Sequence, residues 1–237
     1  MESVKDKVIK ILPQPTDVSC GPTCLQAVYD FYDHEITLER VIKEVKQLKD
    51  GGTLAVMLAN HALKSGFKTT IYTLNIQVFD PTWFDGVVNI SEKLSEQLFY
   101  KGTRRLQQAT NAYLNYLSNN GELKFEDLSP QFLINILKKG QPILTGLSAT
   151  YLYNSAREIP EYNVYHDTKG EAAGHFVVLC GYDEKTKRIK IADPLNPNPI
   201  KDRIQYYNID IQRVVNAILL GILTYDANLL IIQPKNP

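Results

Sequence analysis

Two apolar runs late in the chain, His175 to Tyr182 and Arg188 to Asp193, flank the polar segment Asp183-Glu-Lys-Thr-Lys187. Both runs are rich in β-branched residues, and a short polar connection between two such runs predicts a β-hairpin. Further strands are expected at Phe67 to Leu74, Pro142 to Gly146 and Asn228 to Ile232. The later half of the chain is therefore expected to be rich in sheet.

The earlier part of the chain predicts helices. Pro22 suits the first turn of a helix, and Leu25, Val28 and Tyr32 then recur at helical spacing, so Cys20 lies at a helix start. Capping residues and apolar periodicity predict the other helices. These are a helix opened by Thr37 with Leu48 on its apolar face, then Thr53 to Gly66, Ser91 to Lys101, Thr103 to Asn119, Ser129 to Gly140 and Asp210 to Leu220.

Length and composition limit the class of protein. With 237 residues, 44% of them apolar, we expect one domain over residues 1–237, with a helical insertion near 76–128. The 26 basic and 26 acidic residues balance, which argues against a nucleic-acid partner. No segment has the length of a membrane span or a signal peptide, and three cysteines without framework spacing predict reduced thiols. These features favour a cytoplasmic protein.

Cys20 can be interpreted in two ways. Free cysteine is commonly inert core packing. A helix N-terminus, however, favours a thiolate, and so does a nearby histidine. Cys24 lies one turn later and could form a redox couple or half a metal site with Cys20, but core packing fits it better, and Cys180 lies inside an apolar strand. The histidines are scattered without metal-ligand spacing, so neither a metal nor a cofactor is expected.

His175 follows the small residues Ala172-Ala173-Gly174, which would let a ligand backbone approach the imidazole. A hairpin loop centred near Glu184 places His175 opposite Asp193. A carboxylate there would fix the tautomer of the ring and stabilise its protonated form. A histidine at a sheet edge and an ordinary strand end at Asp193 are the alternatives.

Two further segments lie close to these residues in the sequence. Gln14, bracketed by Pro13 and Pro15, lies on an extended segment, and its amide could donate to an oxyanion beside the Cys20 N–H. It could also be a surface glutamine. A long loop before His175 carries tyrosines that could line a cleft or simply pack: Tyr151, Tyr153, Tyr162 and Tyr165.

Five blocks in order resemble the bacteriocin-processing, double-glycine peptidase family of the papain-like superfamily. They are Gln14, Cys20-Gly-Pro-Thr, the small-residue-His175-Phe-Val-Val-Leu strand, the Gly-Tyr-Asp turn and Ile-Ala-Asp193-Pro194. The resemblance also covers Gly52-Thr-Leu with Gly66-Phe67, and Lys138-Lys-Gly-Gln-Pro-Ile. The resemblance implies an α+β fold in which a cysteine helix packs on an antiparallel sheet bearing histidine and aspartate. It also implies Cys20 as nucleophile, His175 as base, Asp193 as orienting residue and Gln14 as oxyanion donor.

The expected function is hydrolysis of a peptide bond in a peptide or protein substrate through a thioester, with Ala173, Gly174, Tyr151 and Tyr153 as substrate contacts. Acyl transfer, as in transpeptidases resembling phytochelatin synthase, and deamidation would use the same acyl-enzyme. A catalytically silent peptide-binding module is the third possibility. Relatives that cut leader peptides are often parts of transporters, and no transporter is expected in this chain.

Overall fold

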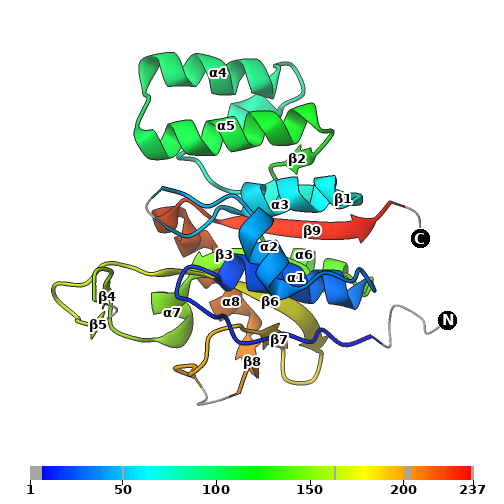
Figure 1. The fold of residues 1–237 in the computed structure, drawn as a ribbon, viewed down its shortest axis with the longest axis vertical. Coiled ribbons are helices and arrows are strands. Elements are labelled where there is room, and N and C mark those ends of the chain that lie inside the picture. The colour runs from blue at the N-terminus through cyan, green and yellow to red at the C-terminus, as the bar shows by residue number, and fades with distance from the viewer. Residues whose placement is uncertain (1–6, 50, 163, 201–203, 236–237) are drawn as a thin grey trace.

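The computed structural model describes residues 7–49, 51–162, 164–200 and 204–235 (Figure 1). Its main element is a seven-stranded sheet with the order β2-β1-β9-β3-β6-β7-β8, in which β1 and β2 are parallel and the other neighbours antiparallel. The strands are β1 (Phe67–Thr73), β2 (Glu122–Lys124), β3 (Ile143–Ser148), β6 (Gly174–Asp183), β7 (Arg188–Ala192), β8 (Tyr206–Asp210) and β9 (Asn228–Pro234). A separate hairpin of β4 (Glu158–Ile159) and β5 (Val164–Tyr165) projects from the body (Figure 1).

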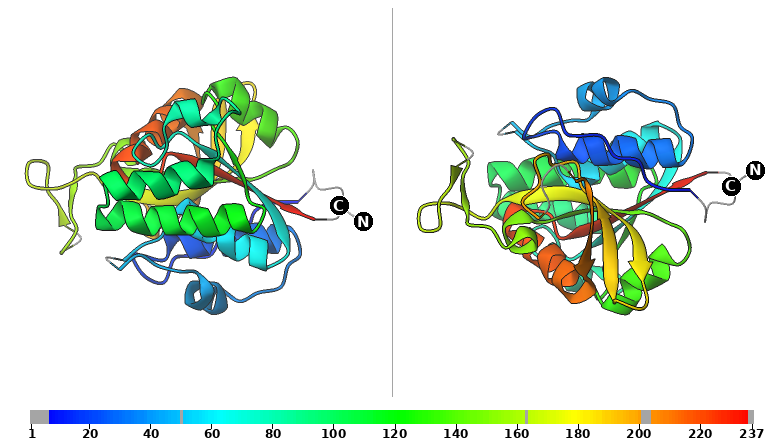
Figure 2. Two further views of the ribbon diagram at one scale, coloured as in Figure 1. Left: turned by 90° about the horizontal axis from the view of Figure 1, so that it is seen from above. Right: turned by 90° about the horizontal axis from the view of Figure 1, so that it is seen from below.

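Helices cover both faces of the sheet, as Figure 2 shows. The chain forms α1 (Cys20–Phe31), α2 (Leu38–Glu44), α3 (Ala55–Lys64), α4 (Ile90–Tyr100), α5 (Arg104–Ser118), α6 (Pro130–Leu137), α7 (Ala149–Tyr153), α8 (Ile211–Leu220) and the 3-10 turns η2 (Pro81–Phe84) and η3 (Gly221–Thr224). Alternate residues of β6 enter opposite cores: Phe176 packs with α1 and α3, and Val177 packs with α8. The predicted α+β class with an antiparallel sheet is confirmed.

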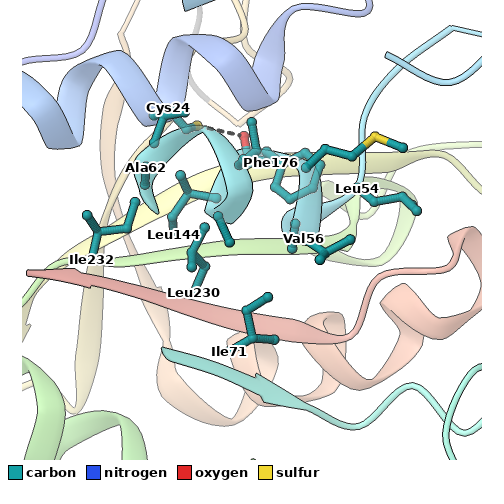
Figure 3. Close-up of a cluster of buried hydrophobic side chains, with 14 of the residues drawn as sticks. Cys24, Leu54, Val56, Ala62, Ile71, Leu144, Phe176, Leu230 and Ile232 are labelled. Atoms are coloured by element: carbon teal, nitrogen blue, oxygen red, sulfur yellow. Dashed lines mark hydrogen bonds between the residues drawn. The ribbon is translucent and has the colours of Figure 1, made fainter. Parts of the chain in front are cut away.

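The core beneath α1 holds the cysteine helix on the sheet. Phe176 of β6, Leu144 of β3 and Leu230 of β9 meet there (Figure 3). The Cys24 Sγ lies 3.3 Å from the Phe176 carbonyl oxygen, and burial raises the pKa of its thiol well above the ordinary value. Burial also raises the pKa of Cys180 to about 11. The structure therefore places Cys24 inside the core, as expected, and leaves Cys180 half-buried against the edge of the same core.

Two helices near the N-terminus differ from the prediction. The helix opened by Thr37 ends at Glu44, because Val45 adopts an extended conformation with ψ 124°. The next helix begins at Ala55 rather than at Thr53, whose hydroxyl donates to the Lys46 carbonyl oxygen instead of capping the helix. Apolar residues continue beyond the end of the first helix and precede the start of the second, so periodicity alone could not locate these two boundaries.

The register of the β6–β7 hairpin also differs from the prediction. The sequence placed His175 opposite Asp193, whereas the structure pairs Val178 with Ala192 as the last pair of β7. Continuing that register would set Asp193 opposite Val177. The loop is centred further along the chain than expected, and β6 contains a bulge. His175 and Val177 lie on the same face of β6. The Asp193 carboxylate therefore meets the His175 imidazole as a diagonal neighbour rather than as a directly opposite one.

The predicted insertion, residues 76–128, forms η2, α4, α5 and β2. Thr103 caps α5 by accepting from the Leu106 N–H, and α5 packs between α3 and α4. Leu94, Leu106 and Tyr113 enter the same core as α1. Within the described ranges, no helix has the length and apolar character that crossing a bilayer requires.

We expect Leu144→Ala to lower the free energy of unfolding by about 2–5 kcal/mol, because it empties a fully buried position between the sheet and α1. Urea denaturation followed by circular dichroism measures the loss. Leu219→Ala is the control, since Leu219 is 42% exposed and its loss should change stability by about 0.5 kcal/mol. Equal effects of the two substitutions would contradict this assignment of the core.

Candidate active site

Cys20 is the first residue of α1 and is half-buried. The turn before it is closed by Ser19, whose hydroxyl donates to the Thr16 carbonyl oxygen at 2.8 Å and accepts from the Thr16 N–H at 3.0 Å. The first amides of a helix have no intrahelical acceptor and carry the positive end of its dipole. The Cys20 side chain therefore starts where a negative charge is stabilised.

His175 and Asp193 form a buried pair. The His175 Nε2 lies 2.8 Å from the Asp193 Oδ1, and the two residues are 7% and 0% exposed. Burial alone would lower the pKa of His175. The charge and hydrogen bond of Asp193, together with the Cys20 side chain, outweigh burial and raise that pKa to about 10. The imidazole is accordingly protonated at neutral pH.

The Asp193 carboxylate is the centre of a hydrogen-bond network. Its Oδ2 accepts from the Tyr207 hydroxyl at 2.5 Å and the Tyr153 hydroxyl at 2.8 Å, and its Oδ1 also accepts from the Leu195 N–H at 2.9 Å. Burial opposes ionisation, but the charge and hydrogen bond of His175, with the Tyr207 and Leu195 donors, hold the pKa of Asp193 below its usual value. The carboxylate thus stays ionised in the interior.

Sequence reasoning missed Tyr207. It lies on β8, which pairs with β7 and places its phenol beside Asp193. The only signal was the short run Tyr206-Tyr-Asn-Ile-Asp210, in which apolar and polar residues nearly alternate. Tyr153, predicted as a substrate contact, also donates to Asp193, and burial with that negative charge raises the pKa of its phenol well above the ordinary value.

Because Nε2 faces Asp193, Nδ1 is the ring nitrogen left to serve Cys20, and the Cys20 side chain is near enough to help raise the pKa of His175. The structure therefore brings together the three residues predicted from distant parts of the sequence. This arrangement suits a cysteine nucleophile, a proton carrier and a group that orients it.

Gln14 lies beside these residues. Its backbone N–H donates to the Pro194 carbonyl oxygen at 2.8 Å, which joins the segment before Cys20 to the residue after Asp193. Its Nε2 donates to the Thr16 carbonyl oxygen at 3.1 Å, and an amide nitrogen has a second hydrogen for another acceptor. The Gln14 Oε1 is buried, with no partner among the described residues.

Two cavities flank His175. We call the first, of about 400 Å³, the hairpin cavity; it is lined by the loop that carries the β4–β5 hairpin and by Gln14, Tyr153, Ala173 and Gly174. We call the second, of about 200 Å³, the Cys20 cavity; its walls include Cys20, Arg105, Gly174, His175 and Asp226. The two cavities share Asp17, Val18, Gly174 and His175 in their linings.

Tyr151 is not brought to this group. Its hydroxyl accepts from the Asn216 Nδ2 at 3.1 Å, and the Arg213 guanidinium lies 5.1 Å from its ring centroid. Both partners belong to α8. The structure thus gives Tyr151 a packing contact, and its predicted role with substrate has no contact to support it.

One protein-family model matches most of the chain. The model of the Peptidase_C39-like family matches residues 7–216. A search of curated protein sequences gives no match.

Three solved structures are similar over nearly the whole chain. A double glycine motif protease from an AMS/PCAT transporter, in complex with the leader peptide, has 15% identity and a TM-score of 0.45, covering 97% of this chain and 96% of its own. A C39-like peptidase from Bacillus anthracis has 15% identity and a TM-score of 0.49, covering 96% and 98%. The peptidase domain of Streptococcus ComA, a bi-functional ABC transporter, has 16% identity and a TM-score of 0.45, covering 96% and 99%.

These identities and TM-scores are too low to assign a function, so the assignment rests on the family match. That match covers the cysteine helix, the histidine strand and Asp193 together. The chain therefore belongs to the Peptidase_C39-like family and is a cysteine-type peptidase.

Proposed function

We propose that this protein hydrolyses a peptide bond through a Cys20-His175-Asp193 triad and a thioester acyl-enzyme. The observation that carries the proposal is the buried 2.8 Å hydrogen bond between the His175 Nε2 and the Asp193 Oδ1, which leaves Nδ1 for Cys20. A protonated imidazole beside the sulfur favours the thiolate, which is the nucleophilic form.

In the proposed reaction the Cys20 thiolate attacks the carbonyl carbon of the scissile peptide. The oxyanion accepts hydrogen bonds from the Cys20 N–H and from the second Nε2 hydrogen of Gln14. One such donor typically supplies about 2.7–4 kcal/mol in the transition state. His175 gives its proton to the departing amine, and the thioester forms as that amine leaves. The neutral imidazole then takes a proton from water, which attacks the thioester and releases the acid.

Two of the predicted substrate contacts, Ala173 and Gly174, line the hairpin cavity next to His175. Gly174 is exposed there, whereas the Ala173 N–H donates to the Thr150 Oγ1 at 3.0 Å and its carbonyl oxygen accepts from the Ala149 N–H at 2.9 Å. A side chain at Gly174 would place its Cβ 2.6 Å from the Thr224 Oγ1, so the close approach of η3 requires glycine there. In this proposal an extended substrate runs past these residues toward Cys20.

We also propose that residues 1–237 form one domain, with residues 76–128 as a helical insertion, and that the protein acts in the cytoplasm. The shared core of α1, α4 and α5 supports a single domain. Free thiols at Cys20, Cys24 and Cys180 are consistent with a reducing compartment.

Alkylation at pH 6 tests the ion pair. We expect iodoacetamide to label Cys20 at least about tenfold faster than the buried Cys24 or the half-buried Cys180, because both of those thiols have raised pKa values. His175→Ala should remove that advantage, as read by intact mass and peptide mapping. Cys20→Ala should lose the fast label and all turnover. Labelling that His175→Ala leaves unchanged would favour a silent peptide-binding module.

Cleavage in H₂¹⁸O separates hydrolysis from the other outcomes of the same acyl-enzyme. Water attack on the thioester should place one ¹⁸O in the new carboxylate of the product, as read by mass spectrometry. Acyl transfer to an added amine would give an amide product without that label. Deamidation would leave the peptide backbone intact.

Tyr153→Phe distinguishes the two roles open to this residue. We expect kcat to fall about tenfold with KM nearly unchanged, since the substitution removes a hydrogen bond of about 1.5 kcal/mol to the buried carboxylate. Tyr165→Phe is the control, because Tyr165 lines the same cavity and is 53% exposed. A raised KM with unchanged kcat would instead make Tyr153 a substrate contact.

A further inference from the structure

The Cys20 cavity is large enough to hold a substrate side chain. Its volume of about 200 Å³ exceeds the roughly 150 Å³ of an engineered cavity that binds benzene. Cys20 and His175 form part of its wall, so a group bound there would lie next to the reacting carbonyl. Asp226 and Arg105 supply its other charged side chains, together with Asp17.

Asp226 is a buried carboxyl that the proposed mechanism does not use. It is 5% exposed, and its Oδ1 has no hydrogen-bond partner among the described residues. The Ala55 N–H at the start of α3 lies close enough to the carboxyl group to favour its ionised form. On the other side, a Cβ at Gly146 would lie 2.6 Å from the Asp226 Cγ, so only glycine in β3 allows this approach. The backbone therefore fixes Asp226 in the cavity wall.

Arg105 reaches the same cavity from α5. Its Nη2 donates to the Thr224 carbonyl oxygen at 3.2 Å, and its guanidinium lies 5.4 Å from the Tyr225 ring centroid. The Nε is buried, with no partner in the described part of the chain. A buried polar atom without a partner is unfavourable, so both walls retain hydrogen-bonding capacity that a ligand or water can satisfy.

We propose that the Cys20 cavity is a specificity subsite for an uncharged carboxamide side chain, glutamine or asparagine, of the substrate. This inference rests on the proposed peptidase function. A carboxamide carries an acceptor for Arg105 and a donor for Asp226 without net charge. A carboxylate would be repelled by Asp226, an ammonium group would be repelled by Arg105, and an apolar group would leave both unsatisfied.

Matched internally quenched peptides test the subsite at pH 8. Glutamine is first scanned through the positions on either side of the scissile bond, and the most sensitive position is then varied among Gln, Glu, Lys and Met. We expect kcat/KM for the Gln peptide to exceed the others by about tenfold or more.

Charge-changing variants should alter this ranking in opposite directions. Arg105→Gln should favour the Lys peptide over the Glu peptide, and Asp226→Asn should favour Glu over Lys. Arg104→Gln is the control, because it removes the same charge from the exposed neighbouring position of α5 and should leave the ranking unchanged. If Arg105→Gln and Asp226→Asn both rank the four peptides as the wild type does, the subsite is contradicted.

A pH measurement needs no variant and therefore remains decisive if Asp226→Asn does not fold. Burial, partly opposed by Arg105, raises the pKa of Asp226 to about 7. Lowering the pH from 8 to 6 therefore protonates Asp226. As a result, kcat/KM for the Glu peptide should rise relative to that for the Gln peptide. His175, whose pKa is raised to about 10, stays protonated over this range. Arg105, Asp17 and Cys20 line the same cavity, and Tyr113 lies near Asp226. The ratio of kcat/KM for the Glu and Gln peptides cancels any effect of pH that is common to both.

The outcomes separate the two proposals. Cleavage with equal kcat/KM for all four peptides would overturn the subsite and leave the peptidase proposal standing. Fast Cys20 labelling without cleavage of any Gln peptide would also overturn the subsite. If Cys20 is not labelled rapidly and no peptide is cleaved, the proposed function itself is overturned.

Discussion

The buried Asp193 carboxylate organises the site. Four donors converge on it from separate parts of the chain: His175, Leu195, Tyr153 and Tyr207. A carboxylate without donors would be strongly disfavoured in this interior, so β6, β7, β8 and α7 must hold their positions together for it to stay ionised. Its charge in turn keeps the imidazole protonated and turned toward the cysteine helix. The proposed chemistry therefore depends on the packing of the sheet edge as much as on Cys20, His175 and Asp193 themselves.

Much of this arrangement could be predicted from local patterns. The proline in the first turn placed Cys20 at a helix start, and two apolar runs around a polar loop placed His175 and Asp193 on neighbouring strands. The exact register could not be predicted, because a bulge and a shifted loop move the pairing without changing the apolar pattern. The contact survived that error because both residues remained on one face of the sheet.

Features that depend on distant parts of the chain were not predictable. Tyr207 reaches Asp193 only because β8 joins the sheet edge, and Arg105 lines the Cys20 cavity only because α5 packs on α3. Asp226 follows a 3-10 turn, and its burial depends on the bare glycine surface of β3. None of these residues lies in a local motif, so their roles become visible only when the elements are packed together.

The backbone bond between the Gln14 N–H and the Pro194 carbonyl oxygen has a practical consequence. It joins the two segments that border the reactive groups through main-chain atoms, so it does not depend on the sulfur or the imidazole. The position of these two segments is thus independent of the reactive side chains. A Cys20→Ala variant keeps this bond, so it can be used to capture uncleaved substrates by affinity purification.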